Sequence, residues 1–283
     1  MTIRGIGVAA LLWPLAAAAA PRIVSTGPAI TEILFALELG PNVAAVSNYC
    51  HYPEAVRRLP KIGTYLEPNL ESIAVLQPDL VIVERLPNNA VDQLRRLRLH
   101  VLEVEFGTLD KIYASMRAIA RAGGVPIRGD QLVSRIRARL EAVRVRAAKL
   151  PPRSMIFLVG RNPGRLEGLI AVGKGSYLNE LIALAGGRNP LAQGPLAYAK
   201  VSLESLVAVN PDLILDMGDM SQTAGTPAHR QAVLRLWQPM KMLAAVRTGN
   251  VHAIDSDIFV VPGPRIADAA EEFARLLHPE PTR

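Results

Sequence analysis

A fourteen-residue pattern occurs twice in this chain and constrains its fold more than any other feature. Residues 69–82 read NLESIAVLQPDLVI and residues 202–215 read SLESLVAVNPDLIL, and the two copies align without a gap at an offset of 133 positions. Solenoid units recur at a spacing of about 20 to 50 residues, so two copies this far apart are not neighbouring repeats of a solenoid. The pattern therefore predicts two similar lobes within one protein.

Each copy predicts a short helix followed by a buried strand. Asn69 and Ser202 are suited to cap the helix, because their side-chain oxygens can accept a free backbone N–H of the first turn. Glu71 and Glu204 fall in that turn, where the helix dipole favours a negative charge. The proline nine residues after each cap ends the helix, and the apolar run that follows predicts a strand.

Strand and helix patterns alternate through the rest of the chain. Short apolar runs at 22–25, 43–47 and 80–83 predict strands, with helical patterns between them, the first closed by Gly40 as a C-terminal cap. Such alternation is typical of a parallel sheet with helices on both faces. We therefore expect an α/β protein of two Rossmann-like lobes with central parallel sheets.

One long amphipathic helix lies between the two copies, at residues 127–150. Its arginines fall largely off one apolar stripe. The apolar positions of that stripe recur every three or four residues: Leu132, Val133, Ile136, Leu140, Val143, Ala147 and Leu150. Two prolines follow it directly. We interpret it as a single connector between lobes, which divides the chain into four parts: 1–20, 21–126, 127–150 and 151–283.

The first twenty residues predict a secretory signal peptide. Arg4 precedes an apolar run that ends in small residues near Ala20. A transmembrane anchor is the alternative, but the run falls short of the roughly 20 residues that span a bilayer. Cys50, the single cysteine, lies well past this segment, so it is no lipid-attachment site. We expect a periplasmic protein without a lipid anchor.

The positive charge is concentrated in one segment. The net charge is +7, and residues 121–165 carry eleven Lys or Arg side chains against only Asp130 and Glu141. Nucleic-acid binding is one interpretation of such a segment. However, aromatic residues do not alternate with the arginines, and an exported protein meets little nucleic acid. We interpret the segment as a solvated helix face and expect no nucleic-acid partner.

No motif in the chain argues for catalysis or for a resident metal. Residues 168–174 resemble a phosphate-binding loop, but Gly175 stands where that loop needs Ser or Thr. The five histidines show no i, i+2 or i, i+4 pair, so no zinc motif is present. An exported enzyme with a cleft between its lobes is the rival class, but it needs a nucleophile–base pair or a metal triad. We expect neither enzymatic activity nor a cofactor.

Aromatic side chains are placed in the loops that follow predicted strands. Tyr49, Cys50 and His51 lie in one such loop, which continues to Tyr65, and Tyr198 lies in a loop of the second lobe. Packing beneath a loop is the ordinary role of such tyrosines. Ligands of open α/β sheets bind at the carboxyl ends of strands, and aromatic faces offer a large apolar area. The loops therefore also predict a site for a flat ligand.

The sequence resembles the periplasmic binding proteins of ABC importers for cobalamin, haem and iron–siderophores, with the cobalamin branch most similar. The resemblance covers about residues 22 to 278. It rests on IVSTGPAITEILFALELG, SNYCHYP, KIGTYLEPNLESIAVLQPDLVI, VGKGSYLNELIALAGG and VSLESLVAVNPDLIL, in this order.

The resemblance implies two lobes joined by one rigid helix, with the ligand in the cleft between them. It implies ligand contacts from Tyr49, Tyr65, Tyr198 and Asp257, to which we add Cys50 and His51 as candidates from the same loop. It also implies that Glu71 and Glu204 dock onto a permease dimer. A monomer that carries cobalamin is the expected form.

This chain departs from the familiar cobalamin receptors at three positions. Tyr65, Tyr198 and Glu84 stand where those receptors have tryptophan. The glutamate removes one aromatic wall, so haem or a ferric siderophore stays open as the alternative ligand. A tyrosine of the 49–65 loop or His51 would then ligate the iron.

Overall fold

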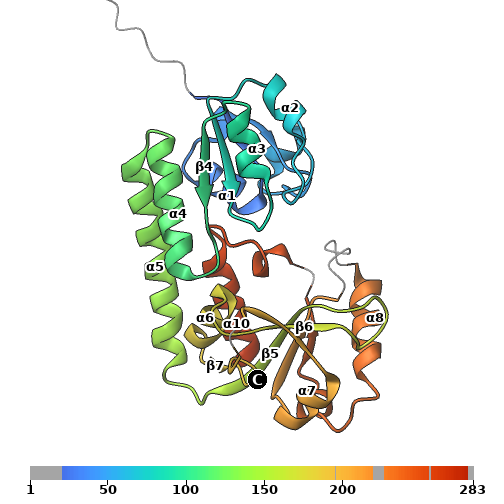
Figure 1. Cartoon of the computed structure of the whole chain (residues 1–283). Helices are drawn as coiled ribbons and strands as arrows, with labels where there is room; N and C mark the ends of the chain where they lie inside the picture. Colours follow the sequence, from blue (N-terminus) through green and yellow to red (C-terminus); the bar gives the residue numbers. More distant parts are fainter. Residues whose placement is uncertain (1–20, 195, 219–225, 255, 280–283) are drawn as a thin grey trace, which may run out of the picture.

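The computed structural model describes residues 21–194, 196–218, 226–254 and 256–279. Two lobes lie one above the other in Figure 1, and helices α4 and α5 run along one side of the molecule. The predicted signal peptide, residues 1–20, lies outside the described residues.

The N-terminal lobe is built on a parallel sheet of four strands in the order β2-β1-β3-β4. The strands are β1 (Ile23–Ser25), β2 (Val43–Val46), β3 (Leu80–Glu84) and β4 (Val101–Val104). Alternate side chains enter two different cores: Ile82 packs with the residues of α1 and α4, while Val81 and Val83 pack with those of α2 and α3. The predicted parallel sheet with helices on both faces is confirmed for this lobe.

The two copies of the repeat form the same local structure. Each is a short helix, α2 (Leu70–Val75) or α7 (Leu203–Val209), followed by a strand, β3 or β9 (Leu213–Asp216). Asn69 and Ser202 cap these helices by accepting the backbone N–H three residues on, at 2.9 and 3.2 Å. Gln77 and Asn210 then adopt left-handed conformations, with φ of 45° and 41°, directly before each proline. Both predicted caps are confirmed.

The aspartate of each copy holds the first strand of its own lobe. Asp79 accepts the backbone N–H of Arg22 and Asp212 accepts that of Ser154, both at 2.7 Å. The equivalent aspartate of each copy thus holds the backbone at the start of the first strand in its own lobe. The repeated Pro-Asp-Leu sequence has a structural role in strand pairing.

The first helix ends differently from the prediction. Helix α1 (Pro28–Ala36) stops before Glu38, which takes the left-handed conformation with φ of 61°, and Gly40 begins a short 3-10 turn instead of capping the helix. The N–H of Leu39 bonds back to the carbonyl of Leu34 at 2.9 Å, which turns the Leu39 side chain into the core. Burial of Leu39 therefore explains why a non-glycine residue occupies the left-handed position.

The connector is α5 (Pro126–Ala147), which packs along α4 (Leu109–Ala122) and against α10 (Ile266–Leu277). The predicted apolar stripe is buried from Leu132 to Ala147. The prediction extended three residues too far, because Leu150 lies beyond the helix and is 45% exposed. Residues before the two prolines are disfavoured in helical conformation, which shortens the helix.

The sheet of the C-terminal lobe is mixed, so the expectation of a parallel sheet was wrong there. Its order is β10-β9-β5-β6-β8, with β7 beside β5, and both β6 pairings are antiparallel. The loop 161–168 returns the chain directly beside β5, and an antiparallel neighbour can be joined by such a short loop. Two strands of this sheet, β6 (Leu169–Val172) and β8 (Tyr198–Val201), were interpreted as loops from the sequence. The other strands are β5 (Arg153–Gly160), β7 (Gly187–Arg188) and β10 (Val251–Ala253).

The remaining helices cover this second sheet. One face packs on α6 (Tyr177–Leu184) and α10, and the other on α7, α8 (Pro227–Trp237) and α9 (Ala244–Arg247). The largest hydrophobic core is continuous between the lobes through α1, α4, α5, α6 and α10. No helix in the described part of the chain is long and apolar enough to cross a membrane.

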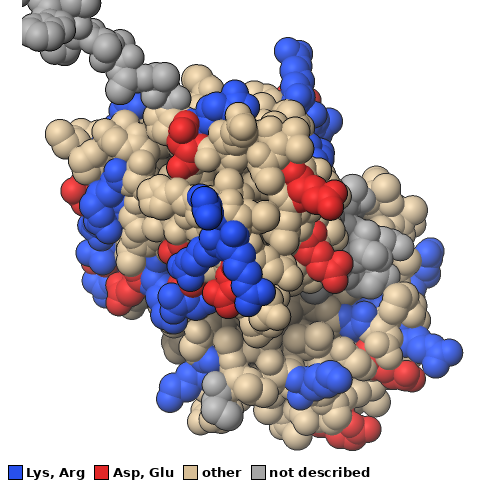
Figure 2. Space-filling model, turned by 45° about the horizontal axis from the view of Figure 1, so that its top comes forward, with Lys and Arg blue, Asp and Glu red and all other residues tan. Residues whose placement is uncertain are grey.

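Several basic side chains of the connector lie in ion pairs on a mixed surface. Figure 2 shows blue and red side chains together along the edge that carries α4 and α5 in Figure 1. Arg139 pairs with Asp268 and Glu271, and Arg144 pairs with Glu141. This arrangement agrees with the prediction of a solvated helix face.

Candidate functional site

Two tyrosines of the N-terminal lobe form an edge-to-face pair after strand β2. The ring centroids of Tyr49 and Tyr65 lie 5.7 Å apart with an interplanar angle of 70°. The loop that carries them is fixed by a backbone bridge between Val46 and Lys61. Tyr49 is 51% exposed, so the pair presents aromatic surface to solvent.

Tyr198 presents a third phenol from the C-terminal lobe. It is the first residue of β8 and is 45% exposed. The hydroxyl of Ser176 donates to the Tyr198 oxygen at 3.2 Å, and the same Ser176 oxygen caps α6 by accepting the N–H of Leu178. The residue that caps α6, Ser176, therefore also positions the aromatic ring of Tyr198.

The carboxyl group of Glu84 interacts with aromatic side chains of both lobes. Electrostatic interactions connect it with Tyr65 of the N-terminal lobe and with Tyr177 and Tyr198 of the C-terminal lobe. Burial raises the pKa of Glu84 to about 7, since a charged carboxylate loses hydration there. Burial also raises the pKa of Tyr65, with the charge of Glu84 as the second cause. We call Tyr49, Tyr65, Glu84 and Tyr198 the inter-lobe tyrosine surface.

The lobes touch directly beside this surface. The N–H of Tyr177, at the start of α6, donates to the carbonyl of Gly107 at 2.8 Å, and the N–H of Leu109 donates to Glu180 at 3.1 Å. The Tyr177 hydroxyl donates to the carbonyl of Phe259 at 3.1 Å. These bonds fix the N-terminus of α6 against the start of α4.

Asp257 lies in a charged cluster where the lobes meet. Its carboxylate accepts a hydrogen bond from Arg265 at 2.9 Å, and the guanidinium of Arg265 also binds Glu32 of the other lobe and lies 4.3 Å from the ring centroid of Tyr52. Burial raises the pKa of Glu32, against the opposing effect of Arg265. The predicted ligand contact of Asp257 is thus already engaged in an ion pair.

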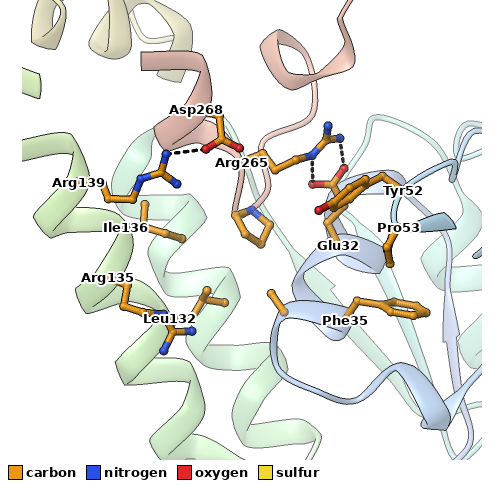
Figure 3. A pocket seen from close by; sticks show the side chains of 12 residues that line it. Glu32, Phe35, Tyr52, Pro53, Leu132, Arg135, Ile136, Arg139, Arg265 and Asp268 are labelled. Carbon is orange, nitrogen blue, oxygen red and sulfur yellow. Dashed lines mark hydrogen bonds and ion pairs between the residues drawn. The ribbon is translucent and has the colours of Figure 1, made fainter. Parts of the chain in front are cut away.

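A pocket of about 530 Å³ adjoins this cluster (Figure 3). Its walls come from α1, α5, the start of α10 and the loop after β2, with these side chains among them: Glu32, Phe35, Tyr52, Leu132, Arg135, Ile136, Arg139, Arg265 and Asp268. None of the four residues of the inter-lobe tyrosine surface lines it. The pocket therefore belongs to the junction of the lobes at the connector.

The two other candidates from the Tyr49 loop, Cys50 and His51, differ in burial. Cys50 is 1% exposed, and its sulfur lies 3.1 and 3.2 Å from the hydroxyls of Thr31 and Ser47, so its thiol faces the core. His51 is exposed at the surface. Within the described residues, no three His, Cys, Asp or Glu side chains are grouped so that they could hold a metal ion.

Glu71 and Glu204 are exposed in the first turns of α2 and α7. The hydroxyl of Ser202 lowers the pKa of Glu204 by donating a hydrogen bond to its carboxylate. Helices α2 and α7 lie at opposite ends of the molecule, away from the connector (Figure 1). The helices that carry the two glutamates are therefore far apart, one on each lobe.

Residues 23–258 match the model of a protein family described as periplasmic binding proteins. The chain belongs to that family. The vitamin B12-binding protein of Vibrio cholerae is 30% identical over 260 residues, which cover 91% of this chain and 89% of the relative. Membership of this family agrees with the expectation of a binding protein.

Two solved structures show the same two-lobed fold. The periplasmic vitamin B12-binding protein of Vibrio cholerae has a TM-score of 0.76 at 28% identity, over 91% of this chain and 96% of that one. The apo form of a periplasmic haem-binding protein from Roseiflexus sp. RS-1 has a TM-score of 0.77 at 28% identity, over 92% and 100%. The predicted fold class is confirmed by both, with the mixed second sheet as the one correction.

Sequence reasoning missed the arrangement around Glu84. The sequence placed Glu84 at a strand end and marked it as a departure, but gave no sign that its carboxyl group interacts electrostatically with Tyr177 and Tyr198 of the other lobe. The available signal was an ionisable residue at the end of a run of apolar strand residues.

Proposed function

We propose that the protein captures a corrinoid, cobalamin, in the periplasm and delivers it to the permease of an ABC importer. The observation that carries the proposal is the inter-lobe tyrosine surface, to which both lobes contribute exposed aromatic rings around one carboxyl group. Ligand sites lie preferentially between domains and at the carboxyl ends of parallel strands, and aromatic faces suit a flat macrocycle. Tyr49, Tyr65 and Tyr198 would contact the macrocycle.

The similarity to vitamin B12-binding proteins supports the same ligand. The relative from Vibrio cholerae covers 91% of this chain, so both lobes are included in the comparison. The charged cluster of Asp257, Arg265 and Glu32 would hold the loop before α10 beside the ligand. We leave Cys50 out of the proposed site, because its thiol is enclosed by the core.

Titration calorimetry tests the proposal. Mature protein titrated with cyanocobalamin, dicyanocobinamide and haemin in separate experiments should bind one corrinoid per chain. Binding of both corrinoids with similar affinity would place the macrocycle, and not the nucleotide loop of cobalamin, in the site. Tight binding of haemin without heat from either corrinoid would refute the proposal.

A haem or ferric siderophore is the second candidate ligand. The similarity to a haem-binding protein at 28% identity favours it, and the exposed Tyr49 and His51 could ligate iron. The absorption spectrum after haemin addition distinguishes the two ligands. A Soret band that shifts on binding and changes in Tyr49→Phe or His51→Gln would favour the iron chelate.

Export and permease docking complete the proposal. Residues 1–20 would direct the protein to the periplasm and be removed, leaving a monomer with no lipid anchor and no resident cofactor. Glu71 and Glu204 would meet basic side chains of a permease dimer, because equivalent sites on two similar lobes match two equivalent subunits.

A further inference from the structure

Glu84 has a backbone position that directs its side chain toward the other lobe. It is the last residue of β3 and pairs with Val104 at the carboxyl end of the parallel sheet. Because side chains alternate along a strand, Glu84 continues the row of Leu80 and Ile82, which face the core shared by both lobes. The carboxyl group therefore lies where that core ends and the inter-lobe tyrosine surface begins.

This carboxyl group has no hydrogen bond or ion pair with any residue in the described part of the chain. The neighbouring Arg85 is engaged elsewhere, with Glu103 at 3.0 Å and Glu105 at 2.8 Å. Glu84 is only partly buried, so its carboxyl group stays accessible from the space between the lobes. An ionisable group with a perturbed pKa and no protein partner, beside exposed aromatic rings, is a candidate ligand contact. The carboxyl group is therefore available to hydrogen-bond a molecule bound between the lobes.

The groups that face Glu84 are phenols from three different elements. Tyr65 comes from the loop after β2, Tyr177 from α6 and Tyr198 from β8. Burial raises the pKa of each phenol above its ordinary value of 10.0, so all three stay neutral near pH 7. No cation is among these groups to balance a negative charge on Glu84.

A bound macrocycle would remove more water from this carboxyl group. An ionised carboxylate enclosed by phenols and a neutral ligand would have no compensating charge, which is strongly unfavourable. Because burial has already brought the pKa of Glu84 to about 7, a small further loss of water makes the neutral acid the stable form. A neutral carboxyl group offers one O–H donor and one carbonyl acceptor side by side.

On this basis, and resting on the proposed function, we infer that Glu84 binds in its neutral form to a primary carboxamide of the cargo. The Glu84 O–H donates to the carboxamide oxygen, and the Glu84 carbonyl accepts a carboxamide N–H. Cobalamin carries several carboxamides on the rim of its macrocycle, whereas haem carries carboxylates there. Glu84 is therefore a specificity-determining residue that favours corrinoids over haem, and cargo binding takes up a proton.

Proton uptake on binding predicts the direction in which ligand affinity changes with pH. The free protein loses the proton of Glu84 as the pH rises through about 7, and each such molecule must regain it to bind. The affinity for cyanocobalamin should therefore fall at least about tenfold between roughly pH 6 and pH 8.5. The carboxamides of the ligand do not ionise in this range, so the change reports on the protein.

Glu84→Gln is the decisive variant, because its amide keeps one donor and one acceptor without an ionisable proton. We expect it to bind cyanocobalamin as the parent does near pH 6, and with no loss near pH 8.5. Glu103→Gln is the matched control, since it makes the same change on the adjacent strand β4 at a glutamate paired with Arg85 and Arg95, and it should keep the pH dependence of the parent. Calorimetry in two buffers of different ionisation enthalpy counts the protons directly, and only proteins with Glu84 should take one up.

The outcomes separate this inference from the proposed function. A parent protein that binds cyanocobalamin equally at both pH values, or a Glu84→Gln variant that keeps the pH dependence, overturns the role of Glu84 and leaves the corrinoid receptor intact. A parent that binds haemin and not cyanocobalamin overturns both. Carbon-13 NMR of the Glu84 carboxyl in the free protein is a second measurement, and a pKa near 4.5 there also overturns the inference.

Discussion

Arg265 of the C-terminal lobe donates hydrogen bonds to both carboxylate oxygens of Glu32 in the N-terminal lobe. The bond from Nε to Oε2 is 2.9 Å long, and the second runs from Nη2 to Oε1. The two side chains are 15% and 3% exposed, although 233 positions separate them in the sequence. This buried pair connects the start of α10 to α1 and fixes one lobe against the other at the connector side of the molecule (Figure 3).

Removal of the arginine should destabilise the protein strongly. Arg265→Ala leaves the Glu32 carboxyl group buried without its partner, and breaking a buried ion pair in this way costs about 3 to 5 kcal/mol. Urea unfolding of the mature protein at pH 7 measures the loss. Arg139→Ala is the control, because Arg139 pairs with Asp268 and Glu271 at the surface and such pairs contribute about 0 to 1 kcal/mol. Equal losses in the two variants would contradict the role of the buried pair.

Glu84 should make the stability of the free protein depend on pH. Its folded pKa of about 7 lies above the ordinary value of 4.5, so the folded state binds more protons between these values. The parent therefore loses stability, relative to Glu84→Gln, as the pH rises through about 7. We expect the variant to be more stable by about 1 to 3 kcal/mol near pH 8.5, and this advantage to vanish below about pH 4.5.

Unfolding by urea at several pH values checks this difference. Glu103→Gln is the control with the opposite sign, because hydrogen bonds from Arg85 lower the pKa of Glu103 and the ionised form is the stable one. That variant should lose stability at high pH relative to the parent. If Glu84→Gln and the parent follow one pH curve, the carboxyl group of Glu84 is hydrated in the free protein.

Tyr65 and Tyr198 should contribute to ligand affinity from opposite lobes. Truncation of either side chain to alanine removes aromatic contact area, which should weaken cyanocobalamin binding by about 1 to 3 kcal/mol. Calorimetry measures the change. Tyr52→Ala is the control, because the Tyr52 ring lies over Arg265 beside the connector pocket. Unchanged affinity in both Tyr65→Ala and Tyr198→Ala would show that the ligand binds elsewhere.

The lobes should move little when ligand binds. Helix α5 is continuous from Pro126 to Ala147, and bending it would break main-chain hydrogen bonds as well as its packing on α4 and α10. Small-angle X-ray scattering should therefore give the same radius of gyration with and without cyanocobalamin. A decrease of several ångströms on binding would indicate a hinge within the connector.

Local sequence rules predicted those parts of the fold that depend on neighbouring residues. The caps at Asn69 and Ser202 were predictable because each side-chain oxygen lies three residues before a free backbone N–H. The apolar stripe on α5 was predictable because apolar residues recur there every three or four positions. Strands β6 and β8 were missed because four-residue strands between glycines and prolines lack a distinguishing pattern.

The candidate site was predictable only in part, because its key relationships join distant residues. Tyr49, Tyr65 and Tyr198 were proposed from predicted loops and from the resemblance to known receptors, although Tyr198 begins strand β8, and their role in binding stays a prediction. The burial of Cys50 and the pairing of Asp257 with Arg265 depend on tertiary packing, which no local pattern encodes. The same holds for Glu84, whose pKa is raised by burial in the folded protein.

Glu71 and Glu204 should be required for delivery to the permease and not for capture of the ligand. They occupy equivalent first-turn positions in the two repeat copies and are both exposed. Complementary charges across an interface chiefly set the rate and orientation of encounter. The double variant Glu71→Arg with Glu204→Arg should therefore bind cyanocobalamin normally and fail to support uptake into liposomes that contain the permease.

A purely structural role predicts a different result for the same double variant. A first-turn glutamate interacts with the dipole of its own helix, so its loss would lower stability slightly and leave uptake normal. Glu54→Arg with Glu167→Arg is the matched control, because it reverses one exposed glutamate on each lobe outside the repeat. Uptake should be lost in the first double variant and retained in the second, since only the first changes the pair of charges that both lobes present in the same way. Equal uptake by the two would leave Glu71 and Glu204 with a helix-stabilising role alone.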